Sequence, residues 1–161
     1  MAMSKLNGNS GNDAAIHDPF IEAAIEQAIK GRDEGGIPIG SVLVLDGEVV
    51  GRGHNQRVQH GSAIRHAEMD CLEQAGRLTA KDYERSIIYS TLSPCDMCSG
   101  AILLYGIPHV VVGENRTFQG PEAYVRSRGV QVDILDNSRC VELMEAFIRD
   151  HPTLWNEDIG E

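Results

Sequence analysis

The sequence lacks the features that would build a membrane span or a broad phosphate-binding surface. No apolar run approaches the roughly 18 residues of a membrane helix, and the Gly- and Asn-rich start has no apolar leader segment. Lysine and arginine number 14 against 24 acidic residues, which gives a formal net charge of −10. We therefore expect a cytoplasmic protein with neither a membrane nor a nucleic acid as its partner.

Cysteine is also scarce, with four in the chain. In a reducing compartment these thiols are not expected to form disulfides, and Cys95 and Cys98 form a C-x-x-C pair that is typical of a metal or redox site. Cys71 and Cys140 lie within helical patterns, so we do not expect them to join such a site. His54, His60 and His109 are interpreted as structural or exposed.

The chain has the length of one domain, which we place at residues 16–161 after a flexible segment over residues 1–15. Residues 152–161 form a tail without clear periodicity. Helices are predicted over 17–36, 64–76, 95–107, 120–129 and 139–150, and strands over 42–45, 48–55, 86–92, 109–114 and 130–135. This alternation predicts an α/β fold, a three-layer α/β/α sandwich with a five-stranded mixed sheet.

Local signals set the expected element ends. Asp18 and Pro19 suit a helix start, Asp46-Gly47 suits a hairpin turn, and Ser138 suits the cap of the last long helix.

The candidate metal ligands each stand at a helix start. Cys95 and Cys98 are three residues apart, so a first helical turn after Pro94 presents both on one side. The helix dipole there lowers thiol pKa values and favours metal binding. His66, at the start of its own helix, supplies a third ligand. Three protein ligands are what a catalytic zinc keeps, with the fourth position left to water.

Glu68 lies two residues after His66, where side chains on a helix diverge by roughly 200°. If the site lies beyond the helix end, both residues can still reach it, and Glu68 is then a candidate general base and acid. A solvated first-turn carboxylate and a redox C-x-x-C pair are the alternatives. Taken together, H-x-E followed by P-C-x-x-C is the pattern of zinc-dependent deaminases.

Longer motifs carry a resemblance to a known family. The segments "EGGIPIG", "GRGHNQR", "TLSPCDMCSGAI", "YGIPHVVVGEN" and "WNEDIGE" lie between Ile21 and Glu161. On these segments the chain resembles the cytidine deaminase superfamily, and within it the small fungal-type cytosine deaminases. The resemblance implies a homodimer with one Zn²⁺ per chain that converts cytosine to uracil and ammonia in pyrimidine salvage.

The resemblance also implies residue roles. Zinc would be held by His66, Cys95 and Cys98, and Glu68 would carry protons. The substrate would be contacted by Asn55, Ala67, Ser93, Asp158, Phe118, Trp155 and Ile39, with the tail 152–161 covering the active site. Taken alone, Asn55 could shape a turn, Phe118 and Trp155 could be core residues, and Asp158 could be solvated.

Three departures from the family pattern leave the substrate open. Ala67 stands where the fungal enzymes have glycine, and Val58 and Asn156 each replace an aromatic residue. The alternatives are a deaminase of another small amino-heterocycle, such as isocytosine, guanine or a creatinine-like base, and a deaminase of tRNA adenosine. A non-enzymatic zinc module is the alternative from a different class, and the presence of Glu68 argues against it, because a structural zinc site has no use for that carboxylate.

Overall fold

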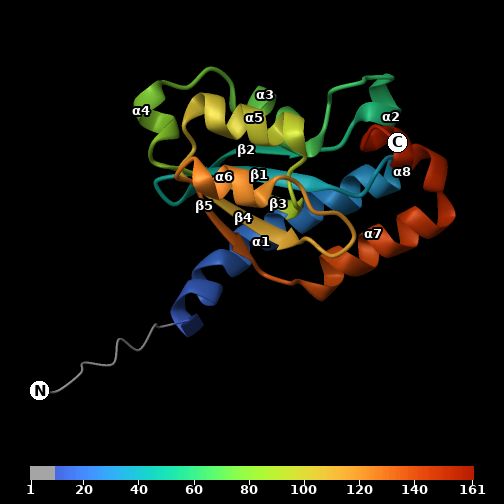
Figure 1. The fold of residues 1–161 in the computed structure, drawn as a ribbon, viewed down its shortest axis with the longest axis horizontal. Coiled ribbons are helices and arrows are strands. Elements are labelled where there is room, and N and C mark those ends of the chain that lie inside the picture. The colour runs from blue at the N-terminus through green and yellow to red at the C-terminus, as the bar shows by residue number, and fades with distance from the viewer. Residues whose placement is uncertain (1–9) are drawn as a thin grey trace, which may run out of the picture.

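A computed structural model describes residues 10–161, with side chains from residue 17 on. Five strands form one mixed sheet in the order β2-β1-β3-β4-β5 (Figure 1). The strands are β1 (Gly40–Leu45), β2 (Glu48–His54), β3 (Ser86–Leu92), β4 (His109–Glu114) and β5 (Gln131–Ile134). The pairs β1–β2 and β1–β3 are antiparallel, and β3–β4 and β4–β5 are parallel. The predicted five-stranded mixed sheet is confirmed.

The hairpin between β1 and β2 turns at Asp46 and Gly47, as the sequence predicts. Both residues have positive φ, 51° and 82°. A two-residue hairpin turn with two positive φ angles matches the twist of the flanking strands, and Asp-Gly tolerates it at low steric cost.

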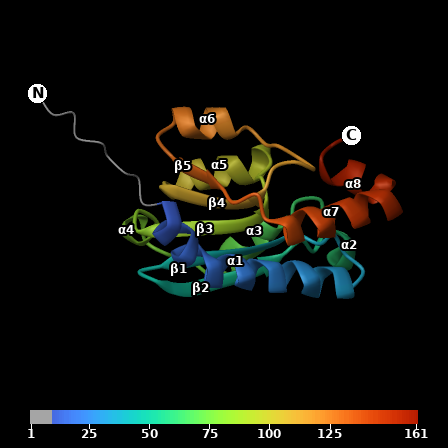
Figure 2. The ribbon, with the colours of Figure 1, turned by 90° about the horizontal axis from the view of Figure 1, so that it is seen from below.

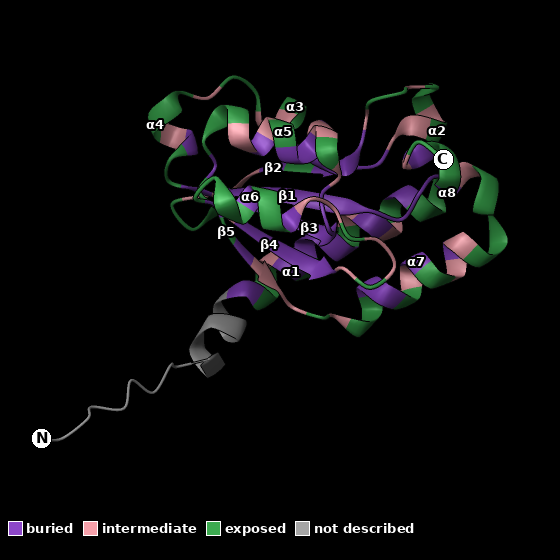
Figure 3. Ribbon diagram, viewed as in Figure 1, coloured by how far each residue is buried: buried purple, intermediate pink, exposed green. Residues whose placement is uncertain are grey.

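Helices cover both faces of the sheet, which confirms the three-layer fold (Figure 2). One face is packed by α1 (Ser10–Asp33) and α7 (Ser138–Asp150), and the other by α3 (Ala67–Ala75), α5 (Asp96–Tyr105) and α6 (Glu122–Ser127). Side chains alternate along each strand, so neighbouring residues enter different cores. Ile88 packs with the α3, α5 and α6 side, and Tyr89 packs with the α1 and α7 side. Figure 3 shows the strands as the buried layer between them.

The structure corrects two expected helix starts. Helix α1 begins at Ser10, so Pro19 lies inside it and Asp18 is not its cap; an interior proline lacks one N–H donor and crowds the preceding turn, yet α1 continues through it. Helix α7 is capped by Asn137, whose side chain accepts from the N–H groups of Arg139 and Cys140, and Ser138 is its first residue. Residues 1–9 of the segment predicted to be flexible lie outside the described residues.

Three short helices are present that the sequence did not predict. They are α2 (Arg57–His60), α4 (Ala80–Tyr83) and α8 (Pro152–Asp158). Helix α8 occupies the tail that showed no periodicity, because a helix of two turns gives too few repeats to read. Within the described residues, no helix combines the length and apolarity needed to cross a membrane.

The topology brings the ends of several helices and strands to one edge of the sheet, the edge formed by the C-terminal ends of β3 and β4. The parallel strands β3 and β4 end there at Leu92 and Glu114, which are paired partners. Helices α3 and α5 begin at this edge, and α8 folds back towards it (Figure 1).

Candidate active site

The three predicted metal ligands converge at this edge. His66 caps α3, Cys95 caps α5, and Cys98 lies in the first turn of α5. The Cys95 Sγ and His66 Nδ1 atoms are 3.4 Å apart, and one ligand atom from each of the three residues lies within 4.8 Å of the others. Both helices therefore direct the positive end of their dipoles towards the cluster.

The pKa values of His66 and Cys95 are shifted in opposite directions. A hydrogen bond from Cys98, with further help from His66, lowers the pKa of Cys95 to about 4. Burial opposes protonation of His66, but the hydrogen bond with Cys95 and the nearby charges of Asp158 and Glu68 outweigh it and raise the pKa of His66 to about 9. The result is a thiolate beside an imidazolium, whose proton a cation would replace. One imidazole and two thiols are a donor set that Zn²⁺ binds in catalytic sites, so these residues fit zinc.

Glu68 is buried beside the ligands. Its carboxylate accepts a hydrogen bond from the Ser90 hydroxyl in strand β3. Burial, reinforced by the charge of Cys95, raises the pKa of Glu68 above its usual value. A carboxyl group with a raised pKa can hold and release a proton nearer neutral pH, which is the property of a general acid and base.

The cap geometry of His66 settles how two residues of an H-x-E motif can serve one site. His66 has extended backbone angles (φ −65°, ψ 163°), and the helix begins at Ala67. The roughly 200° divergence of i and i+2 side chains applies within a helix, so it does not apply to this pair. Glu68 is also buried, which excludes the solvated-carboxylate alternative.

A closed pocket lies over the cluster. Besides His66, Glu68 and Cys95, its lining includes six of the seven predicted substrate residues: Ile39, Ala67, Ser93, Phe118, Trp155 and Asp158. The rings of Phe118 and Trp155 meet edge to face at 5.9 Å between centroids. The cavity measures only about 10 Å³, so these two rings and α8 must shift before a planar heterocycle can enter.

Asn55, the seventh predicted residue, reaches the pocket through Asp158. Its Nδ2 donates to Asp158 Oδ1 at 2.8 Å, and its own Oδ1 accepts from the Arg57 backbone N–H at 3.1 Å. Asn55 therefore shapes the turn after β2 and also holds the tail. Asp158 lies 3.5 Å from His66 Nε2 and is buried, so the reading of Asp158 as a solvated tail residue is wrong.

Two buried glutamates hold the loop that carries Phe118, and sequence reasoning missed both. Glu114 accepts from the backbone N–H groups of Arg116 and Thr117 at 2.7 and 3.0 Å. Glu122 accepts from Ser93 Oγ at 2.8 Å. For Glu114 the available signal in the sequence was its place directly after the apolar run of β4, where a side chain is expected to be buried.

Ser90 and Asp70 were missed as well. Asp70 is almost fully buried and accepts from the His54 N–H, Gln56 Nε2 and Arg65 Nε at 3.0, 2.9 and 3.0 Å. It thereby fixes the segments on either side of Asn55 and His66. A serine within the apolar strand "SIIYSTL" was the visible signal for Ser90.

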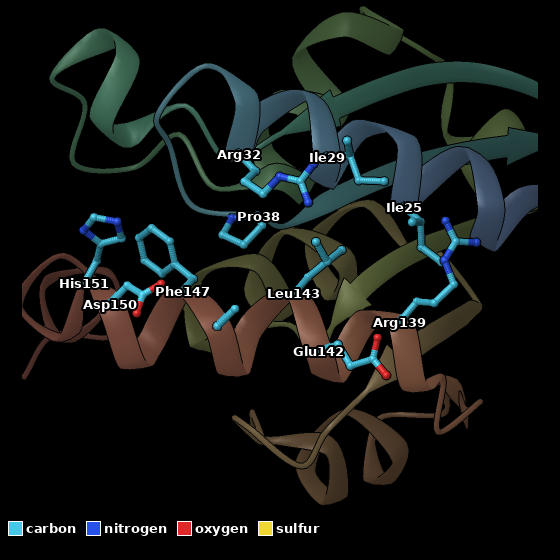
Figure 4. A pocket seen from close by; sticks show the side chains of 11 residues that line it. Ile25, Ile29, Arg32, Pro38, Arg139, Glu142, Leu143, Phe147, Asp150 and His151 are labelled. Carbon is cyan, nitrogen blue, oxygen red and sulfur yellow. The ribbon is translucent and has the colours of Figure 1, made fainter.

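A larger cleft lies elsewhere, between α1 and α7. It has a volume of about 410 Å³, and Figure 4 shows side chains from both helices along it, among them Ile25, Arg32, Leu143 and Phe147. None of the candidate site residues lines this cleft. Charged side chains also line the larger cleft, but the metal-ligand cluster of His66, Cys95 and Cys98 and the buried Glu68 lie at the smaller pocket, which is therefore the candidate active site.

Comparison with known proteins agrees with this assignment. Residues 15–114 match the family model described as the cytidine and deoxycytidylate deaminase zinc-binding region. A cytosine deaminase of Candida albicans is 53% identical over 142 residues, which cover 88% of this chain and 95% of that protein. A tRNA-specific adenosine deaminase of Streptococcus pyogenes is 38% identical over 143 residues, or 81% of this chain and 88% of that protein.

The fold is similar to solved structures. A chain from a study of A-to-I editing by tRNA:A34 deaminases superposes with a TM-score of 0.66 at 27% identity, over 78% of this chain and 99% of that one.

Proposed function

The chain belongs to the cytidine and deoxycytidylate deaminase family, and on this premise we propose that it hydrolyses free cytosine to uracil and ammonia. The observation that carries the proposal is the buried carboxylate of Glu68 next to the His66, Cys95 and Cys98 cluster, inside a pocket closed by α8. A zinc site that served only structure would have no use for a buried proton carrier at its side.

Each group then has a chemical task. His66, Cys95 and Cys98 would hold zinc, which when bound would supply Lewis acidity and lower the pKa of a water molecule. Glu68 takes a proton from that water and delivers it to the ring nitrogen N3 as oxygen adds to C4. Glu68 then takes the proton of the new C4 hydroxyl group and passes it to the exocyclic amine, so that the C4–N bond breaks, the C4=O bond forms and ammonia leaves. Water and cytosine thus balance uracil and ammonia, with Glu68 returned to its first state.

The remaining pocket residues orient the base. We assign the polar edge of cytosine to Asn55, Asp158 and the main chain at Ser93, and its faces to Phe118, Trp155 and Ile39. Ala67 lines the same volume. Because the pocket is lined by two aromatic rings and by the buried side chain of Asp158 from α8, it suits a small planar ligand that can be fully enclosed.

A free base is favoured over tRNA by the same enclosure and by charge. Helix α8 places Trp155 and Asp158 over the pocket, where an extended polynucleotide would have to lie. The formal net charge of −10 repels a phosphate backbone. The relative at 53% identity bears the name cytosine deaminase, whereas the tRNA-specific relative is 38% identical.

The three sequence departures bear unequally on the substrate. Val58 lies on a surface groove with Arg57, Gly61 and Leu154, and Asn156 is exposed. Of the three, only Ala67 lines the catalytic pocket. If the enzyme prefers another amino-heterocycle to cytosine, we therefore expect Ala67 to be the departure that causes it.

Ammonia release from a panel of cytosine, cytidine, isocytosine, guanine and creatinine tests the substrate. We expect the highest kcat/KM for cytosine. Turnover of cytidine without turnover of cytosine would overturn the free-base proposal, and turnover of guanine or isocytosine alone would keep the reaction and replace the substrate.

We also infer that the protein acts in the cytoplasm, in pyrimidine salvage, as a homodimer. The outer surface of α5 and α6 exposes Leu104, Tyr105 and Tyr124 at 75%, 44% and 54% of their surface, and apolar side chains gathered on one surface favour association. Light scattering on the purified protein tests the dimer, and a mass of one chain at micromolar concentration would contradict it.

A further inference from the structure

A second group of metal-ligating side chains lies away from the active site. It consists of His17 from α1, His109 from β4 and Asp133 from β5, and one ligand atom from each lies within 4.8 Å of the others. We propose that these three residues bind a second divalent transition-metal ion of the Zn²⁺ class, separate from the ion at His66, Cys95 and Cys98.

The two clusters lie at opposite ends of the strands of the sheet. His109 is the first residue of β4, and the active site lies beyond the last. Asp133 lies on the parallel neighbour β5, two positions past the residue paired with His109. Figure 1 shows the described start of α1 at the opposite end of the molecule from α8. An ion at His17, His109 and Asp133 therefore could not be the catalytic one.

Strand geometry directs the two sheet residues to the same face. Val111 pairs with Asp133 in register, and Val111 packs in the core under α1. His109 lies two residues before Val111, so it points to the same face of the sheet. The rings of His17 and His109 meet at 5.7 Å between centroids. The fold therefore places the backbones of these three residues so that their side chains can meet on one face of the sheet.

Each ligand is oriented by a further contact. His17 Nδ1 lies 2.7 Å from the buried Tyr89 hydroxyl, His109 Nε2 lies 2.7 Å from Asp133 Oδ2, and Gln131 Nε2 donates to the same oxygen at 3.0 Å. Hydrogen bonds of this kind fix ring orientation and ligand basicity around metals in proteins. The 2.7 Å between His109 Nε2 and Asp133 Oδ2 is a hydrogen-bond distance, and a cation would take the place of the hydrogen between them.

The donor set selects the class of ion. Two imidazoles and one carboxylate suit Zn²⁺, Co²⁺ or Ni²⁺, whereas Ca²⁺ and Mg²⁺ prefer oxygen ligands throughout. The ligands come from three elements far apart in the chain, so a bound ion would link α1 to β4 and β5. Binding to the folded state alone raises its stability with metal concentration.

Equilibrium dialysis against excess Zn²⁺, with any affinity tag removed, tests the site. We expect two zinc ions per chain for the wild type and one for His109→Asn and for Asp133→Asn. His60→Asn is the matched control, because His60 is an exposed histidine whose ring contacts the Gln56 side chain away from both clusters, and it should retain two. One zinc per chain in the wild type, or two in both variants, would overturn the proposal.

The absorption spectrum of the Co²⁺-substituted protein tests the second site independently of the proposed function. Co²⁺ in the cysteine site gives thiolate-to-metal charge-transfer absorption, whereas Co²⁺ at His17, His109 and Asp133 gives only weak ligand-field bands. We expect His109→Asn to lose the second signal and keep the first, and its retained thiolate signal shows that the variant is folded. Loss of both signals together would contradict two independent sites, whatever the outcome of the cytosine assay.

Discussion

The cluster of His66, Cys95 and Cys98 and the cluster of His17, His109 and Asp133 each bring three donors within 4.8 Å, at opposite ends of the strands of one sheet. The first is built at two helix N-termini, supplies two thiols and has Glu68 buried beside it. The second is built mainly on strands, supplies no thiol, and leaves the Asp133 side chain 38% exposed. The two clusters therefore share only the close approach of three donor atoms. The catalytic site differs from the second cluster because a buried proton carrier, Glu68, lies beside it under a pocket.

The largest effect is expected from removing a ligand of the first cluster. Cys95→Ala should abolish stoichiometric zinc at this site and all turnover, and lower the thermal midpoint, because zinc binding contributes to folding stability. Metal analysis with a melting curve measures both. Cys140→Ala, a buried cysteine in the α7 core, is the control and should keep its zinc. Full zinc content in Cys95→Ala would contradict the ligand assignment.

The next largest effect is expected from opening the pocket over the first cluster, which the second cluster lacks. Trp155→Ala removes a buried ring and its edge contact with Phe118, and an aromatic pair of this kind stabilises by about 0.5–1.5 kcal/mol beyond its burial. We expect kcat/KM for cytosine to fall at least about tenfold with zinc content unchanged. Tyr124→Ala, an exposed aromatic on α6, is the control. Equal kcat/KM in the two variants would show that the tail is not part of the pocket.

A smaller effect is expected from the residue that orients the proton carrier. Ser90→Ala removes the hydroxyl that donates to Glu68, and such a bond to a charged group is worth roughly 1.5–3 kcal/mol. That bond lowers the pKa of Glu68 against the effect of burial, so its loss should raise the pKa further. The acidic limb of the pH–rate profile should then move to higher pH, with kcat reduced about tenfold.

Ser90→Thr is the matched variant for that measurement, since it keeps a hydroxyl at the same position. A pH profile that moves equally in Ser90→Thr and Ser90→Ala, or moves in neither, would remove Ser90 from the positioning of Glu68.

The parts of the fold that could be predicted from sequence are those set by local chemistry. The Asp46-Gly47 turn follows from the positive φ that these residues tolerate, and β3 and β4 follow from short apolar runs. Helix α8 could not be predicted, because two turns give little periodicity and its place depends on burial of Trp155 and Asp158 against distant residues. The position of α8 is therefore set by tertiary contacts, which a local sequence pattern does not reveal.

The same division holds for the two metal-ligand clusters. The first could be predicted because H-x-E and C-x-x-C are compact motifs, each at a helix start. The second could not, since His17 and His109 lie 92 positions apart (109 − 17) and no short motif joins them to Asp133. Only the register of β4 with β5 and the crossing of α1 bring them together.

The most direct test of the account is uracil formation from cytosine by the wild type and by Glu68→Gln at equal zinc content. General acid and base catalysis is typically worth about 10²–10⁴-fold, so we predict equimolar uracil and ammonia from the wild type and a rate at least about 10² lower from the variant. Turnover by zinc-loaded Glu68→Gln within a few-fold of the wild type would contradict the central role of the buried carboxylate.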